Sequence, residues 1–392
     1  MSHRQVMARG SVYRKASGWA FRVDAGFHPE TGARRQVLRQ GFPTKKAAQE
    51  ALSDLIGAKT RGSVVTRSTI SVKDYLADWL VTAKSKLRPS THHSYAMAVD
   101  RINAHLGRYQ LQTLTPMQIE RFYTQQLASG GRNGRALAPK TVRNTHVVLR
   151  KALADAERLG LVPRNAAAPA RPPTPIKRDL VTWSTDDVRV FLAAIEGDRL
   201  EMGYRLLAAT GMRRGEVLGL RWRDVDFHLG QLAVAHTITT AGRAVVMGPP
   251  KTPRGRRNVY VDHRTLAALQ EHRKRQREQR LAAGPAWDTS LELVVCDELG
   301  RPIHPDMVSR EFDQLVRKLD VPRIRLHDLR HTHATLALKA GVHPKVVSER
   351  LGHATVGVTL DLYSHVVPAI ARDAAEVIMS AAYGESGASG DM

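Results

Sequence analysis

Four short segments in the C-terminal half of the chain combine residue types that could do chemistry on a phosphate. They are residues 210–216 (TGMRRGE), 251–257 (KTPRGRR), 327–333 (HDLRHTH) and 351–363, which opens on LGH and ends on a tyrosine. The first is a glycine-flanked turn that leads into an apolar run, and the second is a basic turn between two strand-like runs. Taken singly, each arginine could be a surface side chain and the tyrosine a core residue, so only their combination is informative.

Cleavage of a DNA phosphodiester without a metal ion needs side chains of these types. Arginines can bind the non-bridging phosphoryl oxygens through bidentate, charge-assisted hydrogen bonds at any relevant pH. A lysine can protonate the leaving 5′-oxygen, and histidines can donate or accept protons near neutral pH. A tyrosine becomes a nucleophile once its proton is taken or its anion is stabilised, and its phosphate ester keeps the bond energy for rejoining. The residues that supply this set are Arg213, Lys251, His327, Arg330, His353 and Tyr363.

Two metal-based alternatives fit the sequence less well. The histidines at 327, 331 and 333 could suggest zinc, but a zinc site usually adds a cysteine or an acidic residue, and HExxH is absent. Asp224 and Asp226 form an acidic pair near a motif, as a metal-dependent nuclease would use, yet they lack further acidic partners. We therefore expect no metal and no cofactor.

In this order and at these spacings, TGMRRGE, HDLRHTHAT and LGH followed by Tyr363 resemble the motifs of tyrosine site-specific recombinases. The whole chain is similar to the three-domain integrases of bacteriophages and integrative elements. The resemblance implies strand exchange between phage or mobile-element and host attachment sites through a 3′-phosphotyrosyl intermediate, with no need for metal or ATP.

The resemblance also implies a role for each residue of the set. Arg213 and Arg330 would hold the scissile phosphate, and Glu216 would support Arg213 from the next helical turn. His327 and His353 would assist proton transfer and phosphate binding. No position of these signatures is substituted, which argues for an active enzyme.

The general acid and the nucleophile complete the implied set. Lys251, on a hairpin turn, would be the general acid, although Arg254, Arg256 and Arg257 share that turn. Tyr363 would attack the phosphate and leave a free 5′-hydroxyl. Whether it attacks in cis or in trans, and which attachment sequences are read, stays open at this point.

The charge of the chain indicates where a polyanion would bind. Lys and Arg number 60 against 37 Asp and Glu, for a formal net charge of +23. Residues 1–65 hold 12 basic and 4 acidic residues, 66–175 hold 17 and 6, and 176–392 hold 31 and 27. The excess therefore lies mainly in the first 175 residues, which favours a nucleic-acid partner for that part.

Composition also predicts the domain boundaries. Residues 163–175 contain five prolines and should form an extended linker, and a polar stretch near 60–69 marks a softer break. With the resemblance, the expected organisation is an arm-type DNA-binding domain (1–65), a helical core-binding domain (66–165), a Pro-rich linker (166–175), a catalytic domain (176–383) and a disordered tail (384–392).

The expected fold class is multidomain α+β. Residues 1–65 should form three short strands, near 10–15, 18–24 and 33–40, and then a helix from Thr44. Residues 66–162 should form a four-helix bundle whose helices begin near Ser71, 90, Thr115 and 139. The catalytic domain should be mainly helical with a small antiparallel sheet. Its elements are predicted as helices from Ser184 and Glu201, strands near 231–239, 243–248 and 256–261, and helices filling 263–380.

Several basic side chains are candidates for DNA binding. The last helix of the bundle presents a basic face that suits a phosphate backbone, although a basic face can also be merely solvated. The candidates are Lys140, Arg143, Arg150 and Lys151 on that helix and Arg254 and Arg256 in the basic turn.

Two other functions fit the sequence less well than an integrase does. A non-catalytic DNA-binding protein would explain the charge but not the six-residue set. A type IB topoisomerase-like relaxase would share the tyrosine chemistry, but two extra DNA-binding domains and the motif order favour recombination. The expected partners are double-stranded core and arm attachment sites and further copies in a synaptic tetramer. The resemblance also implies an excisionase and a DNA-bending host protein.

The remaining composition points to an intracellular protein. One cysteine, Cys296, excludes an internal disulfide, and no apolar run approaches the roughly 18 residues of a membrane span. We therefore expect a soluble, cytoplasmic chain that associates with the nucleoid and not with a membrane.

Overall fold

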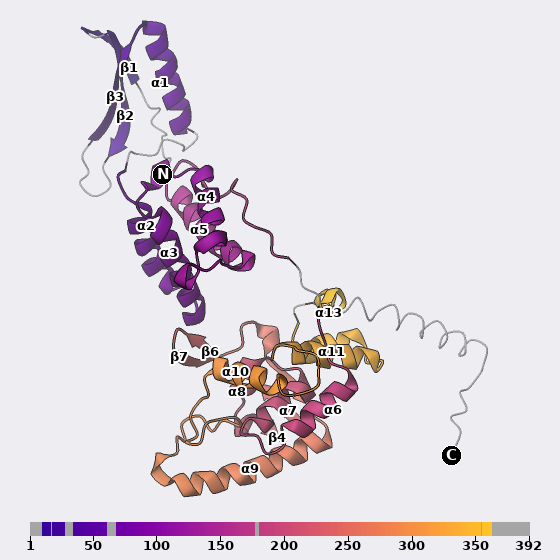
Figure 1. Cartoon of the computed structure of the whole chain (residues 1–392). Helices are drawn as coiled ribbons and strands as arrows, with labels where there is room; N and C mark the ends of the chain where they lie inside the picture. The colour runs from indigo at the N-terminus through magenta and orange to yellow at the C-terminus, as the bar shows by residue number, and fades with distance from the viewer. Residues whose placement is uncertain are drawn as a thin grey trace, which may run out of the picture. The chain divides into compact units, whose positions relative to one another are not determined.

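The computed structural model describes residues 10–16, 18–27, 34–60, 68–176, 180–353 and 355–362 (Figure 1). The chain divides after residue 176 into two compact units, which are described here one at a time. Within the described residues, no helix is both long enough and apolar enough to cross a membrane. The expected mixture of helices with small antiparallel sheets is confirmed.

The first unit opens with a small sheet and a helix. Its elements are β1 (Gly10–Lys15), β2 (Gly18–Phe27), β3 (Arg34–Phe42) and α1 (Lys45–Thr60). The strands pair antiparallel in the order β1-β2-β3. Phe21 and Val23 of β2 pack with Leu52 of α1 in a small apolar core. The side-chain oxygen of Thr44 accepts a hydrogen bond from the Ala47 amide at 3.1 Å, so the predicted helix start is confirmed.

A helical bundle follows in the same unit. Its helices are α2 (Val72–Lys84), α3 (Pro89–Leu106), α4 (Pro116–Ser129) and α5 (Pro139–Arg158), with single 3₁₀ turns at Leu111–Thr113 and Arg132–Gly134. Ser71 caps α2 by accepting from the Asp74 amide, and Thr115 and Gln118 form a capping box on α4. The predicted starts of these helices are confirmed.

The helix α5 has two faces of opposite character. Val142, Leu149 and Leu153 are buried in the core of the bundle. The four predicted DNA contacts on this helix are all exposed: Lys140, Arg143, Arg150 and Lys151. The helix therefore presents basic side chains to solvent, as its sequence pattern indicates.

The proline-rich stretch after α5 forms neither helix nor strand where it is described, but it is partly packed. Ala167 and Ala170 are buried against the bundle, and the Asn165 side-chain amide donates to the Arg150 carbonyl at 2.8 Å. Prolines prevent regular structure by removing amide donors, while the alanine methyl groups between them can still be buried.

The second unit is mainly helical. Its helices are α6 (Thr185–Ala194), α7 (Glu201–Thr210), α8 (Arg214–Leu218), α9 (His263–Ala283), α10 (Pro305–Val316), α11 (Asp328–Lys339), α12 (Pro344–Leu351) and α13 (Val356–Leu362). Its strands are β4 (Val225–Asp226), β5 (Gln231–Val234), β6 (Thr237–Ala241), β7 (Ala244–Gly248) and β8 (Arg257–Tyr260). Three-residue 3₁₀ turns lie at Trp222–Asp224, Pro253–Gly255 and Gly284–Ala286.

The strands of this unit correct the sequence-based expectation. The predicted strand at 231–239 is two strands, β5 and β6, which belong to different sheets. The sheets are a three-stranded one in the order β4-β5-β8 and the β6-β7 hairpin. The basic turn that carries Lys251 therefore connects two sheets and is not a hairpin turn. Pairing of strands distant in sequence is set by packing, which local pattern does not report.

The expectation that helices fill 263–380 is also corrected. Residues 287–304, between α9 and α10, form no helix. Instead Leu293, Val294 and Val295 are buried in the core, and Leu293 forms a β-bridge with Arg221. Gly300, Pro302 and the β-branched pair Val294 and Val295 disfavour a helix in this stretch. Residues beyond 362 lie outside the described part of the chain.

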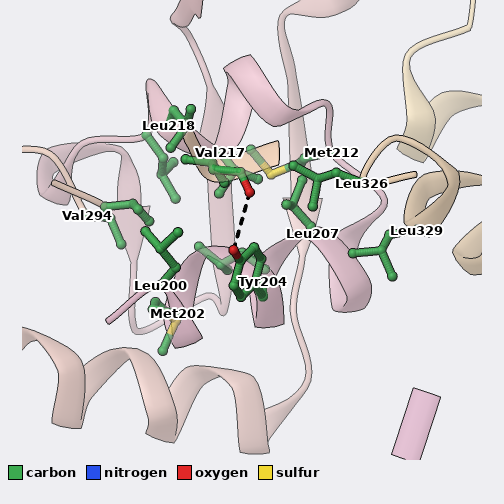
Figure 2. Packing of buried hydrophobic residues seen from close by; sticks show 14 of the residues in the cluster. Leu200, Met202, Tyr204, Leu207, Met212, Val217, Leu218, Val294, Leu326 and Leu329 are labelled. Atoms are coloured by element: carbon green, nitrogen blue, oxygen red, sulfur yellow. Dashed lines mark hydrogen bonds between the residues drawn. The ribbon is translucent and has the colours of Figure 1, made fainter. Parts of the chain in front are cut away.

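A large apolar core holds the turn between α7 and α8 in place (Figure 2). Met212 and Val217 are fully buried in it, and an aromatic cluster lies in the same core (Trp183, Phe191, Tyr204 and Phe312). The Tyr204 hydroxyl donates to the Val308 carbonyl of α10 at 3.3 Å. Burial of Met212 on one side and Val217 on the other fixes the backbone of the residues between them.

Candidate active site

The first predicted segment forms a tight turn between α7 and α8. Gly211 ends α7 with φ +64°, a left-handed conformation that favours glycine. A Cβ atom at Gly211 would lie 2.6 Å from the Leu351 side chain and 2.7 Å from that of His333. Glycine therefore lets α11 and α12 approach the turn and brings the segments near 330 and 352 beside Arg213.

Glu216 holds Arg213 by two hydrogen bonds. Its Oε1 accepts from Nη1 of Arg213 at 2.8 Å, and its Oε2 accepts from the Arg213 backbone amide at 3.0 Å. Burial alone would raise the pKa of this carboxyl. The hydrogen bond and charge of Arg257, together with those of Arg213, outweigh burial and hold the pKa below its usual value. Glu216 is therefore ionised, and its predicted contact with Arg213 is present.

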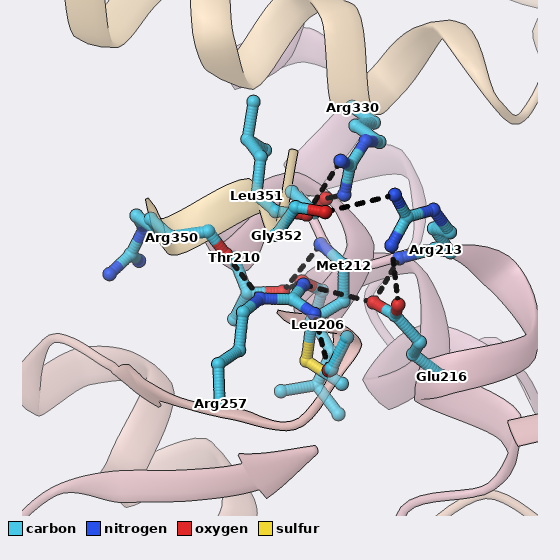
Figure 3. Close-up of polar contacts among 12 residues, drawn as sticks. Leu206, Thr210, Met212, Arg213, Glu216, Arg257, Arg330, Arg350, Leu351 and Gly352 are labelled. Carbon is cyan, nitrogen blue, oxygen red and sulfur yellow. Dashed lines mark hydrogen bonds and ion pairs between the residues drawn. The ribbon is translucent and has the colours of Figure 1, made fainter. Parts of the chain in front are cut away.

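The two predicted phosphate-binding arginines converge on one turn (Figure 3). Arg330 is buried and donates to the carbonyls of Gly211 and Leu351, at 2.8 and 2.6 Å. Arg213 is 43% exposed at its side chain and donates through Nη2 to the Gly352 carbonyl at 3.3 Å. Each terminal nitrogen of an arginine carries two hydrogens, so the exposed guanidinium of Arg213 keeps donors for a further acceptor.

The two predicted histidines lie in the field of both arginines. His327 is exposed at the start of α11, and His353 is half-buried, with Nδ1 2.8 Å from the Thr359 hydroxyl of α13. Desolvation lowers the pKa of His353 to about 4, and the charges of Arg330 and Arg213 add to this. The pKa of His327 is also below its ordinary value, through partial desolvation and the nearby positive groups. Both imidazoles are therefore neutral near pH 7.

The turn before α11 is fixed by an ion pair. The Asp328 carboxylate accepts from the Arg325 backbone amide and side chain, at 2.9 Å and at 2.9 and 2.7 Å. The ring of His331 lies edge-on to that of His327, with centroids 5.3 Å apart. Arg325 stands outside the sequence motifs, and its contact with Asp328 restricts the backbone that carries His327.

Lys251 and Tyr363 are not joined to this group by described contacts. Lys251 is exposed in the connection between β7 and β8, and within the described ranges no hydrogen bond or ion pair links it to the predicted arginines and histidines. Its neighbours Arg254 and Arg256 are exposed as well. Tyr363 lies outside the described residues, and α13 is described as far as Leu362, the residue before it.

Two arginines of the site were missed by sequence reasoning. Arg257 binds Glu216, and Arg350 bridges several elements. Nε of Arg350 donates to Nε2 of His333, whose Nδ1 in turn donates to the Ala208 carbonyl. His333 is therefore a neutral structural histidine. A single sequence carries no signal for such contacts, since they join elements that are distant along the chain.

The acidic residues weighed as metal ligands have structural partners. Asp224 pairs with Arg221 at 3.0 Å, and Asp226 accepts from the amides of His228 and Leu229. In the part of the chain that the structure describes, no group of three His, Cys, Asp or Glu side chains is placed to hold a metal ion.

Comparison with known proteins places the chain in a family. Residues 184–369 match the phage integrase family, residues 11–59 an arm DNA-binding domain, and residues 71–126 the SAM-like N-terminal domain of phage integrases. The tyrosine recombinase XerC-like protein of Caldanaerobacter subterraneus subsp. tengcongensis is 27% identical over 95% of this chain and 99% of its own. The ICEBs1 integrase of Bacillus subtilis is 26% identical over 91% and 95%.

Solved structures share the fold. The Tn1549 transposon integrase in complex with transposon right end DNA matches with a TM-score of 0.65 and 20% identity, covering 79% of this chain and 99% of that one. A lambda integrase tetramer bound to a Holliday junction matches with a TM-score of 0.56 and 16% identity, covering 90% and 94%. The chain therefore belongs to the phage integrase family and is a tyrosine recombinase.

Proposed function

We propose that the chain is a site-specific integrase that exchanges DNA strands between two attachment sites through a phosphotyrosine at Tyr363. The observation that carries the proposal is the convergence of Arg213, Arg330 and His353 on one turn, ten residues before that tyrosine. Three such groups around one point suit a single phosphate, whose charge increases on the non-bridging oxygens in the transition state.

Each residue has a defined part in the proposed reaction. Arg213 and Arg330 donate to the non-bridging oxygens, and Glu216 holds the first of them in place. His327 and His353 are neutral, so each can donate one hydrogen bond to a phosphate oxygen or accept a proton.

The covalent step exchanges one phosphate ester bond for another, so the number of ester bonds to phosphorus does not change. The Tyr363 oxygen gives its proton to one of the neutral imidazoles, His327 or His353, and forms a bond to phosphorus while the bond from phosphorus to the 5′-oxygen breaks. Lys251 protonates that 5′-oxygen. The 5′-hydroxyl of the partner strand reverses the step on the 3′-phosphotyrosine, which requires neither ATP nor a metal.

Binding to DNA is proposed for all three parts of the chain. Residues 1–65 would read arm sites, 66–165 and 176–383 would each bind the core site, and 166–175 would connect them. The exposed basic side chains support this assignment: Lys140, Arg143, Arg150, Lys151, Arg254 and Arg256. The lambda integrase tetramer on a Holliday junction is the precedent for a synaptic tetramer. An excisionase and a DNA-bending host protein would set the direction of recombination, and the complex would act on the nucleoid.

The proposal is tested with a core-site duplex nicked so that the released 5′ end diffuses away, incubated with the protein in EDTA. A covalent protein–DNA adduct should form, disappear in Tyr363→Phe and persist in Tyr383→Phe, the matched control. An adduct that needs Mg²⁺, or that survives Tyr363→Phe, would contradict the mechanism. Recombinant products from two attachment sites distinguish an integrase from a relaxase, which would only relax supercoils.

A further inference from the structure

Arg257, the first residue of β8, uses each nitrogen of its guanidinium on a different partner. Nη2 pairs with Oε2 of Glu216 at 2.9 Å, Nε donates to the Arg350 carbonyl at 2.6 Å, and Nη1 donates to the Gly255 carbonyl at 3.1 Å. Its side chain is only 8% exposed. A side chain so enclosed is unsuited to contact DNA directly, unlike the exposed Arg254 and Arg256.

The end of α12 is held by three arginines. The carbonyls of residues 350–352 accept hydrogen bonds from Arg257, Arg330 and Arg213, in that order, at 2.6, 2.6 and 3.3 Å. The last carbonyls of a helix have no partner within the helix, and cations are favoured at this negative end. Arg257 therefore contacts the same turn as the two proposed phosphate ligands.

These contacts form a closed ring. Arg257 binds Glu216, Glu216 binds Arg213, Arg213 binds the Gly352 carbonyl, and Arg257 also binds the carbonyl two residues earlier (Figure 3). Gly352 has φ +66°, and a Cβ atom there would lie 3.0 Å from Nη1 of Arg257. The guanidinium of Arg257 thus packs against Gly352, the residue that precedes His353.

We infer that Arg257 is a positioning residue for the recombination reaction, acting on Arg213 through Glu216 and on His353 through the end of α12. The inference rests on the proposed function. Only an arginine can meet this geometry, because its planar fork donates in several fixed directions, whereas a lysine is a single point charge. The side chain touches no reacting atom and does its work through its neighbours.

The experiment measures single-turnover cleavage of the nicked core-site duplex, with DNA affinity measured separately. Arg257→Gln should slow cleavage about 100-fold, the cost typical of a misplaced catalytic group, and leave DNA affinity nearly unchanged. Arg257→Lys keeps the positive charge but lacks the planar guanidinium, so it should cleave faster than Arg257→Gln and more slowly than the wild-type chain. The control Arg189→Gln removes an exposed arginine paired with Asp186 and should cleave normally.

A double-mutant cycle tests the route through Glu216. If Arg257 acts partly through that carboxylate, Arg257→Gln with Glu216→Gln should slow cleavage by less than the product of the two single effects. Full multiplicativity would overturn this route.

Three further results would overturn the inference. They are wild-type cleavage by Arg257→Gln, an equal loss of DNA affinity and rate, or, if the Gln variant does not fold, a folded Arg257→Lys that cleaves at the wild-type rate. Failure of the proposed function is a different result, because the wild-type chain would then give no Tyr363-dependent adduct.

Discussion

Within the described contacts of the site, one buried carboxylate serves two arginines. Glu216 is 4% exposed at its side chain and is the hydrogen-bonded partner of both Arg213 and Arg257. A buried charge is tolerated when it is paired and hydrogen-bonded, and removing one partner leaves the others uncompensated. The stability of this region and the geometry of the proposed phosphate ligand Arg213 therefore depend on the same side chain.

Replacing Glu216 with Gln should lower both stability and cleavage. The amide keeps the shape but loses the charge, so Arg257 is left buried without a counter-ion. We expect the free energy of unfolding, measured by urea titration, to fall by about 3 kcal/mol. Single-turnover cleavage should slow by about 100-fold. Glu278→Gln, an exposed change on α9, is the control and should alter neither quantity. Wild-type stability in Glu216→Gln would refute the pairing.

His333 predicts a pH dependence of stability. Burial and the Arg350 charge lower its pKa to about 4, whereas an unfolded histidine titrates near a pKa of about 6.5. Below pH of about 6.5 the unfolded chain binds a proton that the folded chain excludes, so the free energy of unfolding should fall as pH drops toward 4. His333→Gln removes this titration, and the urea midpoint should then change less over that range. An unchanged slope would argue against a buried neutral His333.

At the scale of elements, close backbone contact positions the connection that carries Lys251. The helix α8 lies directly on β6, and a Cβ atom at Gly215 would clash with the Ile238 carbonyl and lie 2.6 Å from the Thr237 hydroxyl. The hairpin β6-β7 leads into residues 249–256. The distance between α8 and β6 therefore fixes the position of the hairpin, and with it the start of the basic connection that carries Lys251.

Gly215→Ala should force α8 and β6 apart. Overpacking of this kind costs about 1–3 kcal/mol, so we expect a lower melting temperature and slower cleavage. Gly248→Ala is the matched control, because the space around Gly248 is open and its φ is not positive. The idea fails if both alanine variants melt at the same temperature as the wild-type chain.

The elements that sequence predicts well are those with local signals. The helix starts at Ser71, Thr115 and Ser184 carry side-chain caps within three residues, so their positions could be inferred. The pairing of β5 with β8 could not, because the 22 residues between Val234 and Arg257 give no local signal for it. The same limit applies to the site.

Among the candidate site residues, motif spacing predicts those whose charged or titratable side chains stand at family-like intervals from one another. Arg213, Arg330 and His353 are predicted in this way, and the structure brings them together. Arg257 and Arg350 are not predicted, because each acts by hydrogen-bonding to elements that are distant along the chain. In a chain with 60 basic residues, an arginine without a motif has no distinguishing mark.

At the scale of the whole molecule, the two units differ in how their charge is used. In residues 176–392 basic and acidic residues number 31 and 27, and many arginines there are paired, as in Arg199 with Glu311. The first 175 residues carry most of the net charge. Charge that is not balanced internally attracts a polyanion over long range, and the affinity it contributes falls as salt rises.

Deleting residues 1–65 should therefore separate affinity from chemistry. The segment carries 12 basic and 4 acidic residues, so its loss should weaken binding to a duplex with arm sites. It should also flatten the dependence of log affinity on log salt, because fewer counterions are released. Cleavage of a nicked core-site duplex should continue, since the hydrogen bonds described for Arg213, Arg330 and Glu216 join residues of the second unit. A duplex with the core site alone is the matched control. Deleting residues 1–65 should lower the affinity for this duplex less than the affinity for the duplex with arm sites. Equal arm-site affinity with and without residues 1–65, measured at two salt concentrations, would remove the basis for an arm-binding role.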